Sequence, residues 1–159
     1  MRKVAVGILL AIVLAAAVSQ SSSRVVGAVE TQVAAAGVGL FPDGATFNGI
    51  PLQGSTFGFD LRVFPDGSAR GNLAIVLAGT SLLGQPQEIT LEGHVERGIT
   101  NPDGSVTFSG TGTLDMGDGT LPAPGISYSV TVTETGLQLT IGTSVLPTQD
   151  VGADDIFIG

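Results

Sequence analysis

The chain has 159 residues, of which 43% are hydrophobic and only 13% are charged, and it contains no cysteine. This balance is the opposite of a disordered chain, and the missing cysteine excludes thiol enzymes, cysteine-ligated zinc and iron–sulfur clusters. Two of the six basic residues, Arg2 and Lys3, lie at the very start, so four arginines face 14 acids after residue 19. The resulting net charge of −10 excludes nucleic acid as a partner, because a polyanion would be repelled.

The first 19 residues have the pattern of a secretory signal peptide. Arg2 and Lys3 precede an apolar run over 4–18, and Ala17-Val18-Ser19 fits a small-x-small cleavage site. The run is shorter than the roughly 20 apolar residues that span a bilayer. We therefore expect cleavage near residue 19, no membrane span afterwards, and a location outside the cell or in the cell envelope.

Residues 20–40 form an N-terminal lead-in that precedes a single all-β domain over 41–159. Part of this lead-in is ambiguous, because 29–36 fits either a first strand or a short helix. The β-branched residues Val25, Val26, Val29 and Val33 favour the strand.

Segments that alternate between apolar and polar residues follow, which is the period of half-buried strands. They are 55–63, 71–79, 88–96, 105–115, 125–134 and 137–142. The segment GNLAIVLAG at 71–79 is apolar on both faces, which predicts a central strand. The last residues, DDIFIG at 154–159, predict a short terminal strand.

Turn sequences separate these segments. FPDG occurs at 41–44 and 64–67, and NPDG occurs at 101–104; proline, aspartate and glycine in this order favour a tight turn. Tight connections predict an antiparallel meander of about seven to eight strands that closes into a small β-barrel and so hides its edges. The longer stretches 80–88 and 117–125 could carry crossovers, which keeps a two-sheet β-sandwich as the alternative.

One histidine lies between two glutamates in the pattern Glu92-Gly93-His94-Val95-Glu96. On a strand these three side chains point the same way, and an imidazole between carboxylates could bind a metal or transfer protons. The competing interpretation, which we favour, is the solvated outer face of a strand.

Acidic residues gather at two further places. Asp115 and Asp118 resemble part of a calcium loop, and Asp150, Asp154 and Asp155 could add ligands if they fold nearby. The distal glutamate of an EF-hand loop is missing, so a plain turn is the favoured interpretation.

Strand-and-turn patterns over about 110 residues resemble a bacterial secreted β domain, the post-choice-of-anchor-protein type domain. They are ATF at 45–47, STFGFDLRV at 55–63, ARGNLAIVLAG at 69–79, VTFSGTGTL at 106–114, ISYSVTVTETG at 126–136 and DDIFIG. The chain departs from that pattern at Glu134, near which the family often has an aspartate. The resemblance implies an extracellular all-β module and brings no catalytic residues.

The function we predict is a non-enzymatic secreted or cell-envelope β module with a structural or interaction role. It has no assigned catalytic, metal-binding or cofactor-binding residue, and its ligand-binding residues and oligomeric state are left open. An unknown protein or a small apolar ligand is the expected partner. One alternative is a binder that holds a small apolar ligand inside the barrel; another is an enzyme built on His94.

Overall fold

The computed structural model describes residues 29–159, so the predicted signal peptide and residues 20–28 of the lead-in lie outside the described part. Within 29–159 all the regular secondary structure is β-strand. No helix in this part of the chain is long and apolar enough to cross a membrane. The strands are β1 (Thr31–Leu40), β2 (Thr46–Phe47), β3 (Ile50–Val63), β4 (Ser68–Thr80), β5 (Pro86–Thr100), β6 (Val106–Asp115), β7 (Ala123–Val132), β8 (Gly136–Ile141), β9 (Ser144–Val145), β10 (Gln149–Val151) and β11 (Ile156–Ile158).

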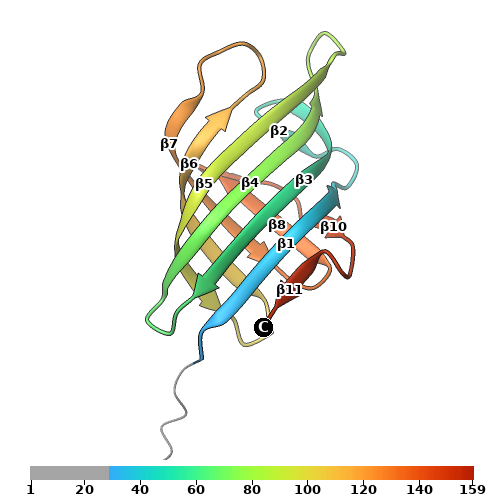
Figure 1. The fold of residues 1–159 in the computed structure, drawn as a ribbon. Coiled ribbons are helices and arrows are strands. Elements are labelled where there is room, and N and C mark those ends of the chain that lie inside the picture. Colours follow the sequence, from blue (N-terminus) through green and yellow to red (C-terminus); the bar gives the residue numbers. More distant parts are fainter. Residues whose placement is uncertain (1–28) are drawn as a thin grey trace, which may run out of the picture.

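The strands form one antiparallel sheet that closes on itself (Figure 1). From β3 to β8 each strand pairs with its neighbour in sequence, while β1 pairs with β3 on one side and with β10 on the other. Because β10 also pairs with β8, eight strands form a hydrogen-bonded ring. The predicted closed antiparallel meander is confirmed. Residues 80–88 and 117–125 join adjacent strands and carry no crossover.

The ring is closed unevenly. β4 and β5 pair along most of their lengths, from Thr80 opposite Pro86 down to Ser68 opposite Arg97. The seam at β10 is much shorter, with Gln149 opposite Leu137 and Asp150 opposite Gly136. A strand of three residues thus completes a sheet whose other walls are long.

One core fills the interior of the ring. Alternate residues of each long strand point inward, as the period-2 pattern predicts. The largest side chains that are less than 2% exposed are Phe108, Leu61, Ile75, Leu77, Ile89, Leu91, Leu137, Leu139, Leu146, Gln149, Val33 and Val106. Aromatic rings add to this packing, since the ring centroids of Phe59 and Phe108 are 5.2 Å apart.

The predicted Asp-Gly turns are confirmed. Gly44, Gly67 and Gly104 have φ of 84°, 81° and 85°, which is the left-handed region that glycine enters without strain. In two of these turns the aspartate caps the following serine, because Oδ1 of Asp66 and of Asp103 accepts from the backbone N–H two residues later at 2.9 Å. The turns fix the register of the long hairpins β3–β4 and β5–β6.

The first strand forms where the lead-in was ambiguous. β1 covers 31–40, so the strand interpretation holds there, although Val33 is the one cited valine inside it. The two ends of the described chain lie side by side: the N–H of Gln32 donates to the carbonyl of Gly159 at 2.6 Å, and the N–H of Gly159 donates back at 2.9 Å. Both ends therefore leave the ring at the lower end in Figure 1.

Candidate functional site

The interior of the ring is one candidate binding site, because small closed sheets can hold a ligand there. Packed side chains occupy it instead. Six inward residues that would fill such an interior are at most 5% exposed: Phe57, Phe59, Leu73, Ile75, Phe108 and Tyr128.

Two polar side chains in this core have an atom without a hydrogen-bond partner within residues 29–159. The hydroxyl of Tyr128 is buried and has no hydrogen-bond partner among the described residues. Burial raises the pKa of Tyr128 to about 12, and the negative charge of Glu96 adds to the effect. At the seam, Gln149 is fully buried and its Oε1 accepts from the hydroxyl of Ser55, while its Nε2 has no partner within residues 29–159.

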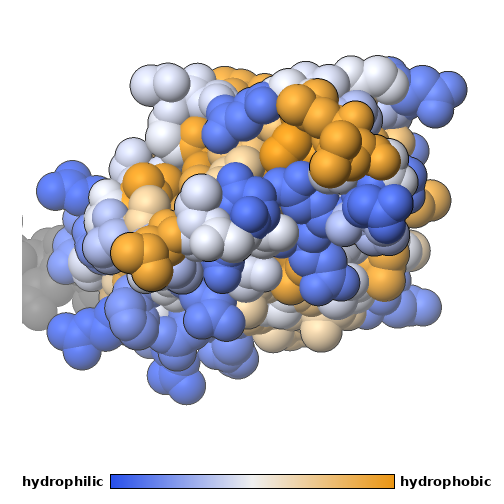
Figure 2. All heavy atoms as spheres, turned by 90° about the horizontal axis from the view of Figure 1, so that it is seen from above, coloured by the Kyte–Doolittle hydropathy of each residue, from blue (hydrophilic) through white to orange (hydrophobic). Residues whose placement is uncertain are grey.

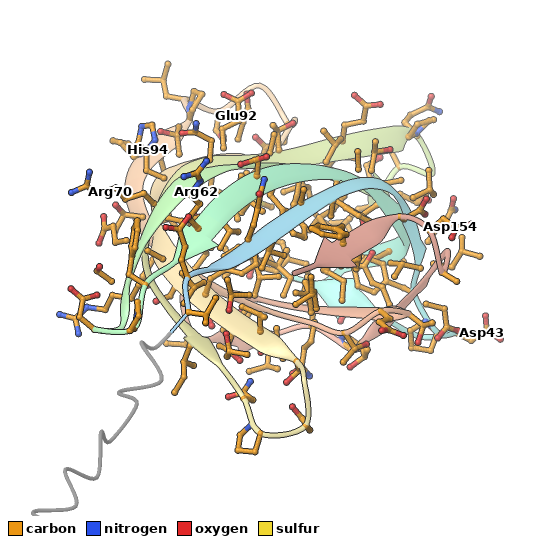
Figure 3. All side chains as sticks on the ribbon, turned by 60° about the horizontal axis from the view of Figure 1, so that its bottom comes forward. Asp43, Arg62, Arg70, Glu92, His94 and Asp154 are labelled. Carbon is orange, nitrogen blue, oxygen red and sulfur yellow. The ribbon has the colours of Figure 1, made fainter. Side chains whose placement is uncertain are left out.

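Glu92 and His94 lie on the outer face of β5, as the alternation predicts, Glu96 follows at a β-bulge, and all three are exposed. Figure 3 shows Glu92 and His94 on the same outer wall as Arg62 and Arg70, far from Asp43 and Asp154. The strand pairing places Asn72 of β4 opposite His94. The wall therefore carries acids, bases and amides close together, in contact with water.

The partner of His94 is an amide and not a carboxylate. Its Nδ1 lies 2.8 Å from Oδ1 of Asn72, and with that oxygen as acceptor the Nδ1–H donates. Glu96 accepts from the hydroxyl of Thr111 at 2.9 Å. The predicted trio shares a face, but its members bond to other residues, so the geometry is that of a hydrogen-bonded strand surface.

A groove of about 640 Å³ lies on this wall, open to solvent. Small residues and polar side chains line it, among them Gly58, Asp60, Asn72, Ala74, Glu92, His94, Thr111 and Thr113. The absence of large side chains at Gly58 and Ala74 creates the hollow.

Three of the carboxylates that resembled calcium ligands accept hydrogen bonds from backbone N–H groups in their own turns. Oδ1 of Asp115 accepts from the N–H of Gly117 at 2.9 Å, and Oδ1 of Asp118 accepts from Thr120 at the same distance. Asp155 accepts from the N–H of Gly152 at 3.2 Å. Over residues 29–159 no three His, Asp or Glu side chains come together as a group that could hold a metal ion.

One surface feature was not recognised as a candidate from the sequence. Leu82 and Leu83, in the β4–β5 connection, are 92% and 87% exposed, and Leu121, in the β6–β7 connection, is 92% exposed. Both connections lie at the upper end of the ring in Figure 1, opposite the chain ends. The signal was present, because leucines stood in the two stretches considered as crossovers, where no alternation assigns them to a core.

Comparison of the chain with models of protein families, with curated proteins and with solved structures finds no match. The resemblance to the secreted β domain therefore stays a prediction. The candidate site rests on the geometry alone.

Proposed function

We propose that the protein is a non-enzymatic β module that acts outside the cell or in the cell envelope, in a structural or interaction role. The observation that carries the proposal is the packed interior. With inward positions filled by Phe57, Ile75, Phe108 and their neighbours, binding partners are left with the outer surface and the loops.

The packed interior is also the argument against the small-ligand alternative. Ligand pockets in proteins have volumes of about 300–1,000 Å³, and the groove of about 640 Å³ is on the outside of the ring, open to water. An apolar ligand would have to displace core side chains to enter.

Benzene binding tests this point with a matched pair. Phe108→Ala removes a ring that is 1% exposed and opens an apolar cavity of the kind that binds benzene. We expect benzene to raise the melting temperature of the variant and leave that of the wild type unchanged. A wild type stabilised by benzene or by a fatty acid would favour the binder instead.

The enzyme alternative depends on His94, which is exposed and bonded to Asn72. A screen against ester, phosphate and glycoside substrates should give no turnover above buffer. Turnover that His94→Gln abolishes, with the fold intact by circular dichroism, would show that the protein is an enzyme.

Export is tested by expression of the full chain in a bacterial host. The signal pattern predicts that the product is found outside the cytoplasm, with an intact mass that corresponds to cleavage near residue 19. Retention of the uncut chain in the cytoplasm would contradict the proposed location.

A further inference from the structure

We propose that the upper end of the ring docks on the surface of a zwitterionic phospholipid layer, which has no net charge, through Leu82, Leu83 and Leu121. The inference deepens the proposed function and rests on it, because it names the kind of partner that the module contacts. We call the two connections 81–85 and 116–122 the leucine tips.

The exposure of these leucines is the first observation. Their side chains are 87–92% exposed, whereas the leucines along the strands that face inward are buried. Large apolar side chains held in water at the ends of loops gain free energy when an apolar phase covers them.

The two leucine tips lie at the same end of the ring, and a hydrogen bond connects the second tip to the strand that follows the first. They join consecutive strands of the meander at the same end, and the side chain amide of Gln87 donates to the carbonyl of Met116 at 2.7 Å. Figure 1 shows both tips projecting beyond the strands at that end. Seen from above in Figure 2, apolar surface stands in separate places among hydrophilic side chains. One flat layer can therefore meet both tips together.

The charge pattern selects the kind of layer. Residues 80–87 contain no charged residue, nor do residues 119–125, although the chain has 14 acids. Glu88 and Asp115 lie on the adjoining strands, and the exposed Asp118 lies within the second tip itself. Anionic lipid would be repelled by these carboxylates and by the net charge of −10 left by four arginines, so zwitterionic headgroups fit better.

The shape favours lipid over a protein partner. Protein hot spots insert into matching pockets and cluster at the centre of an interface. The leucines instead stand on two convex tips, and none of them lines the grooves found on the outer surface. A fluid phase accommodates separate projections without a complementary shape.

Flotation of the processed protein with phosphatidylcholine vesicles tests the proposal. We expect wild type to float with the vesicles, and the triple variant Leu82→Ser, Leu83→Ser, Leu121→Ser to lose at least tenfold in partitioning. The matched control is Val29→Ser, an apolar residue 81% exposed at the other end; it should float like wild type. Unchanged melting temperatures exclude misfolding as the cause.

A fluorescent label gives the orientation, because the chain has no cysteine of its own. An environment-sensitive dye on Gln85→Cys should brighten and shift to the blue with the vesicles, and the same dye on Thr135→Cys, in the β7–β8 turn, should not. Vesicles with 30% phosphatidylglycerol should bind less protein.

Three results would overturn the proposal: no flotation of wild type, equal flotation of the triple variant, or stronger binding to anionic vesicles. Concentration-dependent dimerisation that the triple variant abolishes, without vesicle binding, would assign the leucine tips to a second copy of the chain. Each of these leaves export, the packed interior and the lack of turnover untouched, so failure here is distinct from failure of the proposed function.

Discussion

The hydroxyl of Tyr128 is a polar group in an apolar core, and its titration reports how well the ring excludes water. It is the one tyrosine of the chain, which has no tryptophan, so absorbance near 295 nm follows it alone. We expect a pKa of about 12 in the folded protein, against an ordinary value of 10.0 that urea should restore. Because the folded value is raised, ionisation of Tyr128 costs the fold nothing below pH 10, and the free energy of unfolding falls as the pH rises from 10 through 12.

The same hydroxyl predicts the effect of Tyr128→Phe. The variant removes a buried group that lacks a partner among the described residues and keeps the ring. Since an unpaired buried hydroxyl costs roughly 1–3 kcal/mol, the variant should unfold at equal or higher urea concentration. A loss of more than 1 kcal/mol would show that the hydroxyl has a bonding partner, for example a buried water.

Gly93 makes room for Tyr128, and this close approach gives a second residue-scale prediction. A Cβ at position 93 would lie 2.6 Å from Cε1 of Tyr128 and 2.8 Å from the carbonyl oxygen of Thr111. Overpacking of this kind costs about 1–3 kcal/mol. We expect Gly93→Ala to lower the urea midpoint, while Gly58→Ala, on the open outer face with nothing within 4 Å of its Cβ, should have little effect.

The scale of single elements is where the sequence was most informative. Alternation and Asp-Gly turns predicted the long hairpins, because each strand has one face in the core and one in water. The strand 71–79 shows the limit of this reasoning. It lies within the ring as predicted, yet the outward side chains Ala74 and Ala78 are exposed, so its second apolar face does not mean burial on both sides.

The turn after β5 carries a pH-dependent prediction. Hydrogen bonds from the hydroxyl and the backbone N–H of Ser105 lower the pKa of Asp103 below its ordinary value of 3.8. A lowered folded value means that the stabilisation is present above 3.8 and disappears as the pH falls below it. Asp103→Asn should therefore be less stable than wild type at pH 7 and approach it at pH 2.5, by urea unfolding. A difference independent of pH would contradict this role of the carboxylate.

At the scale of the whole molecule, the short seam is the expected weak point. Hydrogen exchange should be faster at β10 and at the start of β8 than along β4 and β5, because little sheet surrounds the seam. Ser55→Ala, which removes the donor to buried Gln149, should speed exchange at β10 and leave the β4–β5 hairpin unchanged. Uniform exchange around the ring would contradict this view.

Closure itself was predictable, but its seam was not. A meander of seven or eight strands must hide its edges, and that argument needs no knowledge of contacts. The predicted terminal strand exists as β11, yet it pairs with β1 and the ring closes through β10. A strand of three residues around a buried glutamine carries no alternation to detect. The leucine tips left a weaker signal, because leucines in two stretches without alternation are assigned to no core, but the sequence pattern does not give their exposure at loop ends.

The adjacency of Gln32 and Gly159 has a consequence for how the module can be connected. A circular permutant that joins these neighbours through a short linker and opens at the 101–104 turn should fold as the parent does. For the same reason, the ring could be inserted into a surface loop of another domain. That domain would then lie at the end of the ring where Gln32 and Gly159 meet, and the leucines would point away from it.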